Sequence, residues 1–308
     1  MLKLVYLASM NMMIRLDKIY IAIGSVMLGI LCVDSYGIII KFLGDFYSII
    51  QLTVFRNTFA VLPLLALLYF TKSFSSTLSD LNVRFLIICL IRGICFTLMH
   101  ICYFLAITNM NFATASTLTF SAPFFIAIFS IFLLNEKVGI YRWSAIIIGF
   151  IGVVMITKPG SDLFTYYSLL PLLVAIFWSI AMIVLKFIPD SFSTAKIQFY
   201  SLLFSIIGSI FLYFFTSDHQ TIANYKDFSL MVATGVLGGI AAILFIYAYR
   251  LVEASKLTSF EYLAIPSSFI MGWFFFKEAP LDQLFPGVIA IILAGMIIIW
   301  RDSHREGK

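Results

Sequence analysis

Residues 85–107 read FLIICLIRGICFTLMHICYFLAI, a continuous apolar run interrupted by a single charge, Arg92. A helix of about 20 residues crosses the ~30 Å hydrocarbon core of a bilayer, so this run has the length of a transmembrane helix. Similar runs at 146–156 and 289–299 lack the apolar–polar alternation of a barrel strand. Because a membrane-spanning segment must be a helix or part of a closed barrel, these runs predict helices.

The composition of the whole chain also indicates a membrane protein. Of its 308 residues, 62% are hydrophobic and only 11% are charged, and the mean hydropathy is +1.06. Such values exclude an ordinary soluble domain. We predict an all-α membrane protein with ten transmembrane helices, at residues 19–40, 46–70, 85–107, 112–134, 141–157, 167–187, 195–215, 229–250, 255–276 and 283–300.

The ends of the chain and its cysteines give little functional signal. We expect residues 1–18 to be a cytoplasmic N-terminal segment and residues 302–308 a cytoplasmic tail. The apolar stretch 4–8 is too short for the core of a secretory signal, so no cleaved signal peptide is expected.

All four cysteines fall in apolar runs, without the paired Cys/His spacing of a zinc site. The sequence therefore predicts neither a metal nor a cofactor.

The distribution of basic residues predicts the orientation in the membrane. With the N-terminus inside, fourteen Lys and Arg residues lie on the cytoplasmic side and four lie opposite, while Arg56 and Arg92 fall within the membrane. Cytoplasmic loops are enriched in Lys and Arg, so both termini are expected in the cytoplasm. Orientation therefore accounts for the net charge of +5, and no nucleic-acid partner is needed to explain it.

The chain also repeats itself with a spacing of 142–145 residues. Matching positions are Pro123 and Pro266, Gly152 and Gly295, Glu136 and Glu278, and the pairs Lys41-Phe42 and Lys186-Phe187. Each half then holds five helices, an odd number, so the second half must enter the membrane upside down. Inverted repeats of this kind form many secondary transporters, with the solute site between the halves near mid-depth.

Several short motifs occur in a fixed order along this plan. They are Ile91-Arg92-Gly93, Ser121-Ala122-Pro123, Asn135-Glu136, Gly149-Phe150-Ile151-Gly152 and Lys158-Pro159-Gly160 in the first half, and Phe260-Glu261-Tyr262, Gly272-Trp273, Phe276-Lys277-Glu278 and Gly287 in the second. Over residues 20–301 the chain resembles the drug/metabolite transporter superfamily, in its ten-helix EamA-type branch.

The resemblance implies a fold and a mode of action. It implies a first EamA repeat at 19–158 and a second at 159–301, around a central cavity, with alternating access and no ATP hydrolysis. The pattern of Asp34, Arg56 and Arg92-Gly93 is similar to that of bacterial metabolite carriers, including those for S-adenosylmethionine uptake and riboflavin. It implies a location in the bacterial inner membrane. A P-loop motif does not occur in the sequence, which fits a secondary carrier.

Four charges inside the apolar runs mark the candidate site: Asp34, Arg56, Arg92 and Glu261. Charged residues in transmembrane helices are costly and usually face a wet cavity or one another. Judged by depth alone, Asp34 could meet Arg56, and Glu261 could meet Arg92. Two structural ion pairs are therefore one interpretation, and solute ligands in a shared chamber are the other.

In the functional interpretation each charge has a role. Arg92 is the first candidate for a carboxylate or phosphate of the solute, because its guanidinium donates paired hydrogen bonds. Glu261, with Asp34 as the second candidate, would receive a cationic centre or a coupling proton. The two signs together suit an amphoteric metabolite.

Uncharged candidates accompany these four residues. Arg92, Phe96, His100 and Tyr103 share one face of the third helix, and His100 is either a core residue or a proton relay. Aromatic rings that could stack on a solute are Trp178, Tyr262 and Trp273, although packing or interfacial anchoring explains such residues equally well. Pro123 and Pro266 are expected to kink their helices, and Gly235, Gly238 and Gly239 to allow close helix packing.

The sequence thus predicts a secondary transporter of a small polar or amphoteric metabolite, similar to an amino acid or S-adenosylmethionine. Its predicted partners are that solute and the lipid bilayer, while a coupling proton, a counter-substrate and the oligomeric state stay open. The alternatives are an exporter of lipophilic compounds, a passive channel and an intramembrane enzyme. We expect no enzyme, because the sequence holds no nucleophile–base or metal constellation within the apolar runs.

Overall fold

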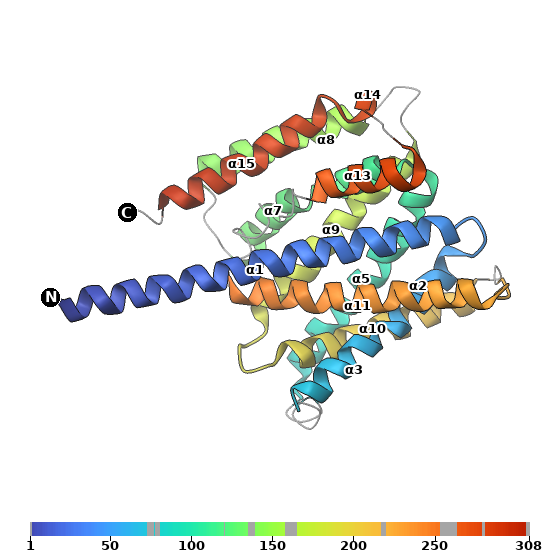
Figure 1. The fold of residues 1–308 in the computed structure, drawn as a ribbon, viewed down its shortest axis with the longest axis horizontal. Helices are drawn as coiled ribbons and strands as arrows, with labels where there is room; N and C mark the ends of the chain where they lie inside the picture. Colours follow the sequence, from blue (N-terminus) through green and yellow to red (C-terminus); the bar gives the residue numbers. More distant parts are fainter. Residues whose placement is uncertain are drawn as a thin grey trace.

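The computed structural model describes residues 2–72, 77, 81–119, 121–134, 139–157, 165–216, 220–252, 264–278 and 281–305, and in these ranges the chain forms helices and turns without strands (Figure 1). The longer helices of the first half are α1 (Leu2–Leu43), α2 (Ile49–Phe59), α3 (Val61–Phe70), α5 (Val83–Asn109), α6 (Phe112–Thr119), α7 (Ala122–Leu134) and α8 (Ile140–Thr157). Those of the second half are α9 (Leu170–Ile183), α10 (Thr194–Phe214), α11 (Tyr225–Leu251), α13 (Ala264–Phe276), α14 (Leu281–Leu284) and α15 (Gly287–Arg305).

The helical fold class is confirmed, and seven helical segments in the described residues are long and apolar enough to cross a membrane. They are Tyr20–Leu43, Ile49–Phe70, Val83–Asn109, Phe112–Leu134, Tyr166–Phe187, Thr194–Phe214 and Tyr225–Leu251. Two shorter apolar helices are Ile147–Ile156 and Ala264–Phe276. The chain is therefore a multi-pass membrane protein, and large apolar side chains such as Phe70 and Phe214 are exposed on the outside of the bundle, where lipid can cover them.

The helices differ from the predicted segments in three places. Helix α1 begins at Leu2, so the expected N-terminal segment of residues 1–18 continues into the first predicted helix without a break. The predicted segment 46–70 divides at Ala60 into α2 and α3. The segment 112–134 divides between Thr119 and Ala122 into α6 and α7.

Pro123 does not kink a continuous helix, and for Pro266 the residues that precede Ala264 lie outside the described part of the chain. Pro123 is the second residue of α7, and Pro266 is the third residue of α13. Proline is tolerated in the first turn of a helix, because the amide groups there have no intrahelical acceptor. Pro123 therefore marks the start of α7, which is the local reason that segment 112–134 is interrupted.

Matching caps begin equivalent helices in the two halves. The side chains of Asn82 and Asn224, 142 residues apart, accept hydrogen bonds from the amides of the third residue of α5 and α11 at 2.7 Å and 2.8 Å. The Ser48 and Ser193 hydroxyls, 145 residues apart, cap α2 and α10 in the same way, each at 3.2 Å. Such caps satisfy the free amides at a helix start. The repeat seen in the sequence therefore has a local structural counterpart.

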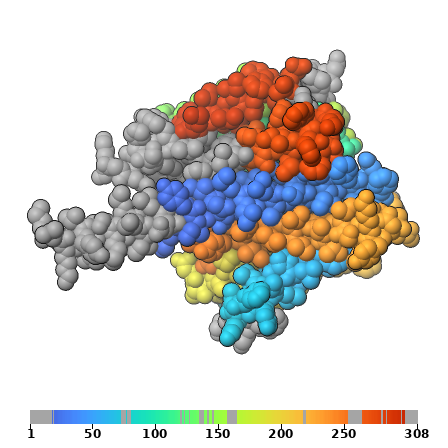
Figure 2. Space-filling view, viewed as in Figure 1, coloured from blue at the N-terminus to red at the C-terminus, as the bar shows by residue number. Residues whose placement is uncertain are grey.

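The helix packing pairs elements from opposite halves of the chain. Helix α1 packs along α11, α5 packs on α9 and α10, and α2 packs on α11. Figure 1 shows α8 and α15 lying together as an outer pair, and in Figure 2 the surfaces of α1 (blue) and α11 (orange) form adjacent bands. The core consequently lies where α1, α5, α9 and α11 meet.

Glycines let these helices approach closely, as expected for Gly235, Gly238 and Gly239. A Cβ at Gly93 of α5 would lie 2.5 Å from Phe204 Cβ of α10, and one at Gly235 of α11 would lie 2.4 Å from Phe59 Cβ of α2. Small residues at such crossings allow backbone contact between membrane helices. Gly93 and Gly235 are 142 residues apart and meet phenylalanines 145 residues apart, so the same contact occurs twice between the two halves.

We predict that Gly93→Ala destabilises the bundle by about 1–3 kcal/mol, because the added methyl overlaps Phe204 and the backbone of α10. The measurement is the melting temperature of the detergent-purified protein, which should fall by several degrees. Gly24→Ala on α1 is the matched control, since a Cβ there meets nothing within 4 Å. Equal melting temperatures for both variants would contradict the close-packing role of Gly93.

Candidate functional site

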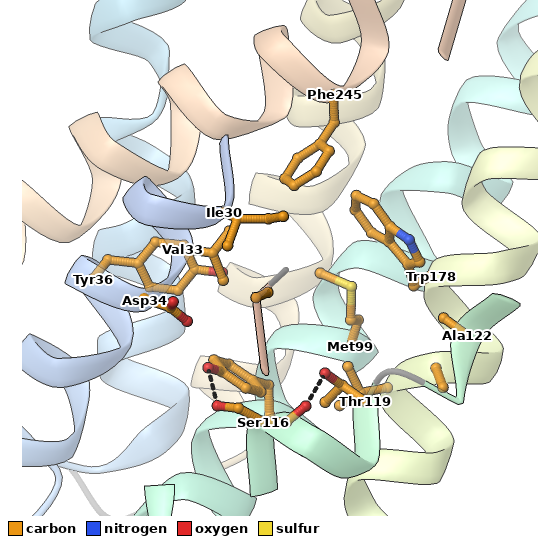
Figure 3. Close-up of a pocket in the computed structure, with 14 residues that line it drawn as sticks. Ile30, Val33, Asp34, Tyr36, Met99, Ser116, Thr119, Ala122, Trp178 and Phe245 are labelled. Atoms are coloured by element: carbon orange, nitrogen blue, oxygen red, sulfur yellow. Dashed lines mark hydrogen bonds between the residues drawn. The ribbon is translucent and has the colours of Figure 1, made fainter. Parts of the chain in front are cut away.

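A partly open cavity lies in the bundle, lined mainly by residues of α1, α5, α6, α9 and α11. Its volume is about 120 Å³, and its walls are mostly apolar or aromatic with a few polar groups. Figure 3 shows Asp34 and Tyr36 entering from α1 on one side and Trp178 from α9 on the other, with Ser116 of α6 below and Phe245 of α11 above. Elements from both halves of the chain line it, so the cavity lies between the two halves.

Asp34 is the negatively charged residue of this cavity. Its side chain is only 3% exposed, and its carboxylate accepts a hydrogen bond from the Ser267 hydroxyl of α13 at 2.5 Å. A second polar contact of the wall joins the Tyr103 and Ser116 hydroxyls at 3.4 Å (Figure 3). Burial of a carboxylate is costly unless it is paired or hydrogen-bonded, so one hydroxyl leaves Asp34 able to receive a cationic partner.

A second, smaller cavity of about 40 Å³ adjoins the first. The two share the lining residues Val33, Tyr36, Met99, Trp178 and Phe245. The polar side chains of the second cavity are Arg56 of α2, His100 of α5, and Gln198 and Ser205 of α10. The two cavities together form a chamber with a carboxylate at one end and a guanidinium at the other.

The polar groups of the second cavity are buried and only partly satisfied within the protein. Arg56 is 6% exposed, His100 2% and Gln198 3%. Arg56 donates one hydrogen bond, to Asn57 Oδ1 at 3.1 Å, and its guanidinium lies 5.5 Å from the centre of the Tyr36 ring. Arg56 Nε, His100 Nδ1 and Gln198 Oε1 have no hydrogen-bond partner. Most buried polar atoms in proteins are paired, so three unpaired atoms around one cavity are unusual.

Arg92 has a different environment. It is fully buried, donates from Nε to the Ser201 hydroxyl of α10 at 3.2 Å and also donates to the Ala181 carbonyl of α9. Its guanidinium lies 5.1 Å from the centre of the Phe96 ring. Arg92 is absent from the residues that line the two central cavities. It holds α5, α9 and α10 together, next to the chamber.

The structure brings together five of the predicted site residues: Asp34, Arg56, His100, Tyr103 and Trp178 line the chamber. Trp273 does not line it, because its side chain is 59% exposed on the outer face of α13. Glu261 and Tyr262 lie outside the described residues, and so does the predicted contact between Glu261 and Arg92.

Asp34 and Arg56 do not form the suggested ion pair in the described part of the chain. The partner of Asp34 is Ser267, and the hydrogen-bond acceptor of Arg56 is Asn57. Tyr36 lines both cavities, whereas Asp34 lines the first and Arg56 the second. The two charges therefore lie at different ends of one chamber.

Sequence reasoning missed six polar or aromatic residues of the chamber: Tyr36, Ser116, Thr119, Gln198, Ser205 and Phe245. Gln198 gave a usable signal, because it is an amide within the apolar run 195–215. Tyr36 and Phe245 gave none, since Tyr and Phe are frequent in this chain. In the described part of the chain no cluster of three or more His, Cys, Asp or Glu side chains has the arrangement of a metal site.

An ion pair closes one end of the bundle, away from the chamber. Lys41 Nζ, at the end of α1, donates to Glu278 Oε1 at 2.6 Å and to the Met110 carbonyl at 2.9 Å. The Phe112 amide, at the start of α6, donates to Glu278 Oε2 at 2.6 Å. This latch, formed by Lys41, Met110, Phe112 and Glu278, joins the end of α1 to the α5–α6 turn and the end of α13.

Comparison with solved structures supports the fold. A crystal structure of a protein with 18% sequence identity superimposes with a TM-score of 0.66, covering 94% of this chain and 99% of the other. At this identity the similarity concerns the fold alone.

Comparison with characterised sequences identifies related transporters. The chain is 26% identical over 291 residues to an S-adenosylmethionine uptake transporter of Rickettsia bellii, covering 94% of this chain and 96% of the relative. It is 29% identical over 201 residues to a riboflavin transporter of Brucella anthropi, covering 64% and 71%. It is 25% identical over 268 residues to the pseudopaline exporter CntI of Pseudomonas aeruginosa, covering 84% and 94%.

A family model also matches the chain, once in each half. The EamA-like transporter family model matches residues 20–158 and again residues 165–301. These two matches cover nearly the whole chain and fall on its two repeats. The chain belongs to the EamA-like transporter family, a part of the drug/metabolite transporter superfamily.

Proposed function

We propose that this transporter of small metabolites is a secondary carrier for an amphoteric solute, which it moves by alternating access. The observation that carries the proposal is the central chamber, with the Asp34 carboxylate at one end and the Arg56 guanidinium at the other. Both residues are buried inside the bundle, and ionisable groups placed there usually mark a solute pathway. A solute with a cationic and an anionic group would neutralise both ends at once.

The walls of the chamber agree with this class of solute. Trp178 and Phe245 offer aromatic faces with ring centres 5.0 Å apart, and a cationic group can bind favourably over such faces. The names of the relatives denote carriers of S-adenosylmethionine, riboflavin and pseudopaline, all small metabolites. A chamber lined only by apolar residues would instead suit a lipophilic compound, and the buried charges of this one argue against that alternative.

The size of the cavity supports a mechanism with a conformational change. Pockets for drug-sized ligands usually exceed roughly 300 Å³, whereas the larger cavity here measures about 120 Å³. A metabolite therefore enters only when helices around the chamber move apart. Alternating access supplies that movement, by exposing the same chamber first to one side of the membrane and then to the other.

The inverted repeat, with units at 19–158 and 159–301, would supply the two states. If each helix is exchanged for its counterpart in the other half, the contact of α1 with α11 becomes that of α9 with α5, and the contact of α2 with α11 becomes that of α10 with α5. All four contacts are present. The counterpart of α2 is α10 and that of α8 is α15, and each of these helices also packs against its own counterpart. Because the contacts of the two halves are equivalent, each half can adopt the conformation of the other. The chamber would then open to the opposite side of the membrane, which favours a carrier over a passive channel.

The latch between Lys41 and Glu278 fits the closed end of such a carrier. Both side chains are largely buried, with 14% and 19% exposure. We place this end on the outer face of the inner membrane and both termini in the cytoplasm, in accord with the distribution of basic residues. In this arrangement the latch blocks the outer entrance to the chamber in the conformation described here.

We predict that the purified protein in proteoliposomes shows counterflow. Vesicles preloaded with an unlabelled solute should accumulate the same labelled solute faster than empty vesicles, because a loaded carrier returns its site across the membrane in exchange. S-adenosyl-L-methionine and riboflavin are the first probes, followed by a panel of amino acids and nucleosides. Uptake of every transported probe at equal rates into loaded and empty vesicles would indicate a channel and contradict the proposal.

We predict that Asp34→Asn reduces uptake of a cationic or amphoteric solute at least tenfold at matched expression. A buried hydrogen bond to a charged group is worth about 1.5–3 kcal/mol, and each ~1.4 kcal/mol corresponds to a factor of ten in affinity. Asp45→Asn is the control, since Asp45 is an exposed aspartate just beyond α1. Wild-type uptake by Asp34→Asn would remove the carboxylate from the proposed mechanism.

We predict that Lys41→Gln opens the outer entrance. A membrane-impermeant maleimide should label a cysteine placed at Thr119, in the chamber wall, about fivefold faster in this variant, in keeping with the loss of about 1 kcal/mol from an ion pair. Lys277→Gln, at an exposed lysine next to Glu278, is the control. If both variants are labelled at the wild-type rate, the latch does not govern access to the chamber.

A further inference from the structure

The smaller cavity offers a more specific arrangement than a general polar pocket. Three side chains from three different helices, Arg56 of α2, His100 of α5 and Gln198 of α10, converge on it. Each is at least nine-tenths buried, and each has one polar atom without a hydrogen-bond partner. Leaving such atoms unpaired costs on the order of 1–3 kcal/mol each, so the arrangement indicates a ligand group.

We infer that Arg56, Gln198 and His100 form a subsite for the α-amino-acid head group of the solute. The inference rests on the proposed function, because this subsite is the guanidinium end of the same chamber. The solute carboxylate would accept from Arg56 Nε and the neighbouring guanidinium edge, and its ammonium group would donate to Gln198 Oε1. The remainder of the solute would extend past Met99 and Trp178 towards Asp34.

The chemistry of the three groups selects this class of ligand. Arginine is a donor without acceptor capacity and is always charged, so an anionic oxygen must face it. The free oxygen of Gln198 is an acceptor and needs a donor, which a sulfate or simple carboxylate lacks and which a phosphate offers only on a protonated oxygen. An α-amino acid carries its anionic carboxylate and its ammonium donor on the same carbon atom, a compact arrangement that suits a cavity of about 40 Å³. His100, an acceptor or a donor according to its tautomer, can serve either group.

Gly238 of α11 determines where the guanidinium lies. A Cβ at this position would lie 2.5 Å from Arg56 Nε, 2.6 Å from one terminal nitrogen and 2.8 Å from Cζ. Only a glycine leaves room for the flat guanidinium between α2 and α11. Gly238→Ala therefore displaces the charge without removing it, which makes it a test of position that is separate from a test of charge.

The subsite can be tested by ligand binding with chemically trimmed probes. The probes are S-adenosyl-L-methionine and S-methyl-L-methionine, each with its carboxyl methyl ester and its N-acetyl derivative, and binding is followed by thermal stabilisation of the detergent-purified protein. We expect the wild-type protein to bind at least one parent compound, and to bind its ester and its N-acetyl derivative at least tenfold more weakly. This comparison needs no variant and does not depend on variants folding.

Variants then assign each contact. Arg56→Gln and Gly238→Ala should weaken binding of the parent at least tenfold while changing binding of the ester less than threefold, because the ester lacks the carboxylate. Gln198→Leu should weaken the parent but have little effect on the N-acetyl derivative. Gly24→Ala is the matched glycine control and should bind all probes as the wild type does.

Two results would overturn the inference. One is equal binding of parent, ester and N-acetyl derivative, which would mean that water alone satisfies the three polar atoms. The other is counterflow of a solute without an α-amino-acid group, such as riboflavin, while neither parent compound binds. In both cases the proposed carrier function would stand if counterflow is seen, whereas an absence of counterflow for every probe would contradict the function itself.

Discussion

The low polarity of the bilayer governs the whole structure, because water is not available in the hydrocarbon layer to satisfy charges or backbone groups. The helices satisfy their own backbones, and the intramembrane charges Asp34, Arg56 and Arg92 all turn towards the inside of the bundle. Apolar side chains such as Phe70 and Phe214 occupy the outer surface instead. The polar chamber is thus a direct consequence of placing charged residues on membrane helices.

The two arginines show two ways of meeting this constraint. Arg92 uses protein acceptors on α9 and α10, so its charge stabilises the packing of three helices. Arg56 donates to the adjacent Asn57, lies beside Tyr36 and keeps Nε without a partner at a cavity, whereas the atom without a partner in Arg92, Nη2, lies away from the cavity linings. A buried charge without full pairing is destabilising, and a site that binds a charged solute transiently requires that kind of incomplete pairing.

Close packing and the repeat are connected through glycine. Gly93 and Gly235 allow the same approach twice between helices of the two halves, against Phe204 and Phe59. Between α8 and α15, Gly152 and Gly287 would each place a Cβ within 3 Å of the other's carbonyl oxygen, at 2.7 Å and 2.5 Å. Membrane helices associate through such backbone contact because lipid removes most of the hydrophobic driving force between them. The equivalent contacts of the two halves are what an exchange between two conformations would need.

The sequence by itself determined the helical class, the approximate positions of most described helices and three of the buried charges, Asp34, Arg56 and Arg92. Apolar length and the cost of charge in lipid are both properties of the chain alone. Only the tertiary structure decided which charges share the chamber. It placed Arg56 and Gln198 at the cavity and Arg92 beside it, because side-chain direction depends on how helices distant in sequence pack together. Trp273 faces outwards for the same reason, since residues about half a helix turn apart lie on opposite faces, one towards lipid and one towards the chamber.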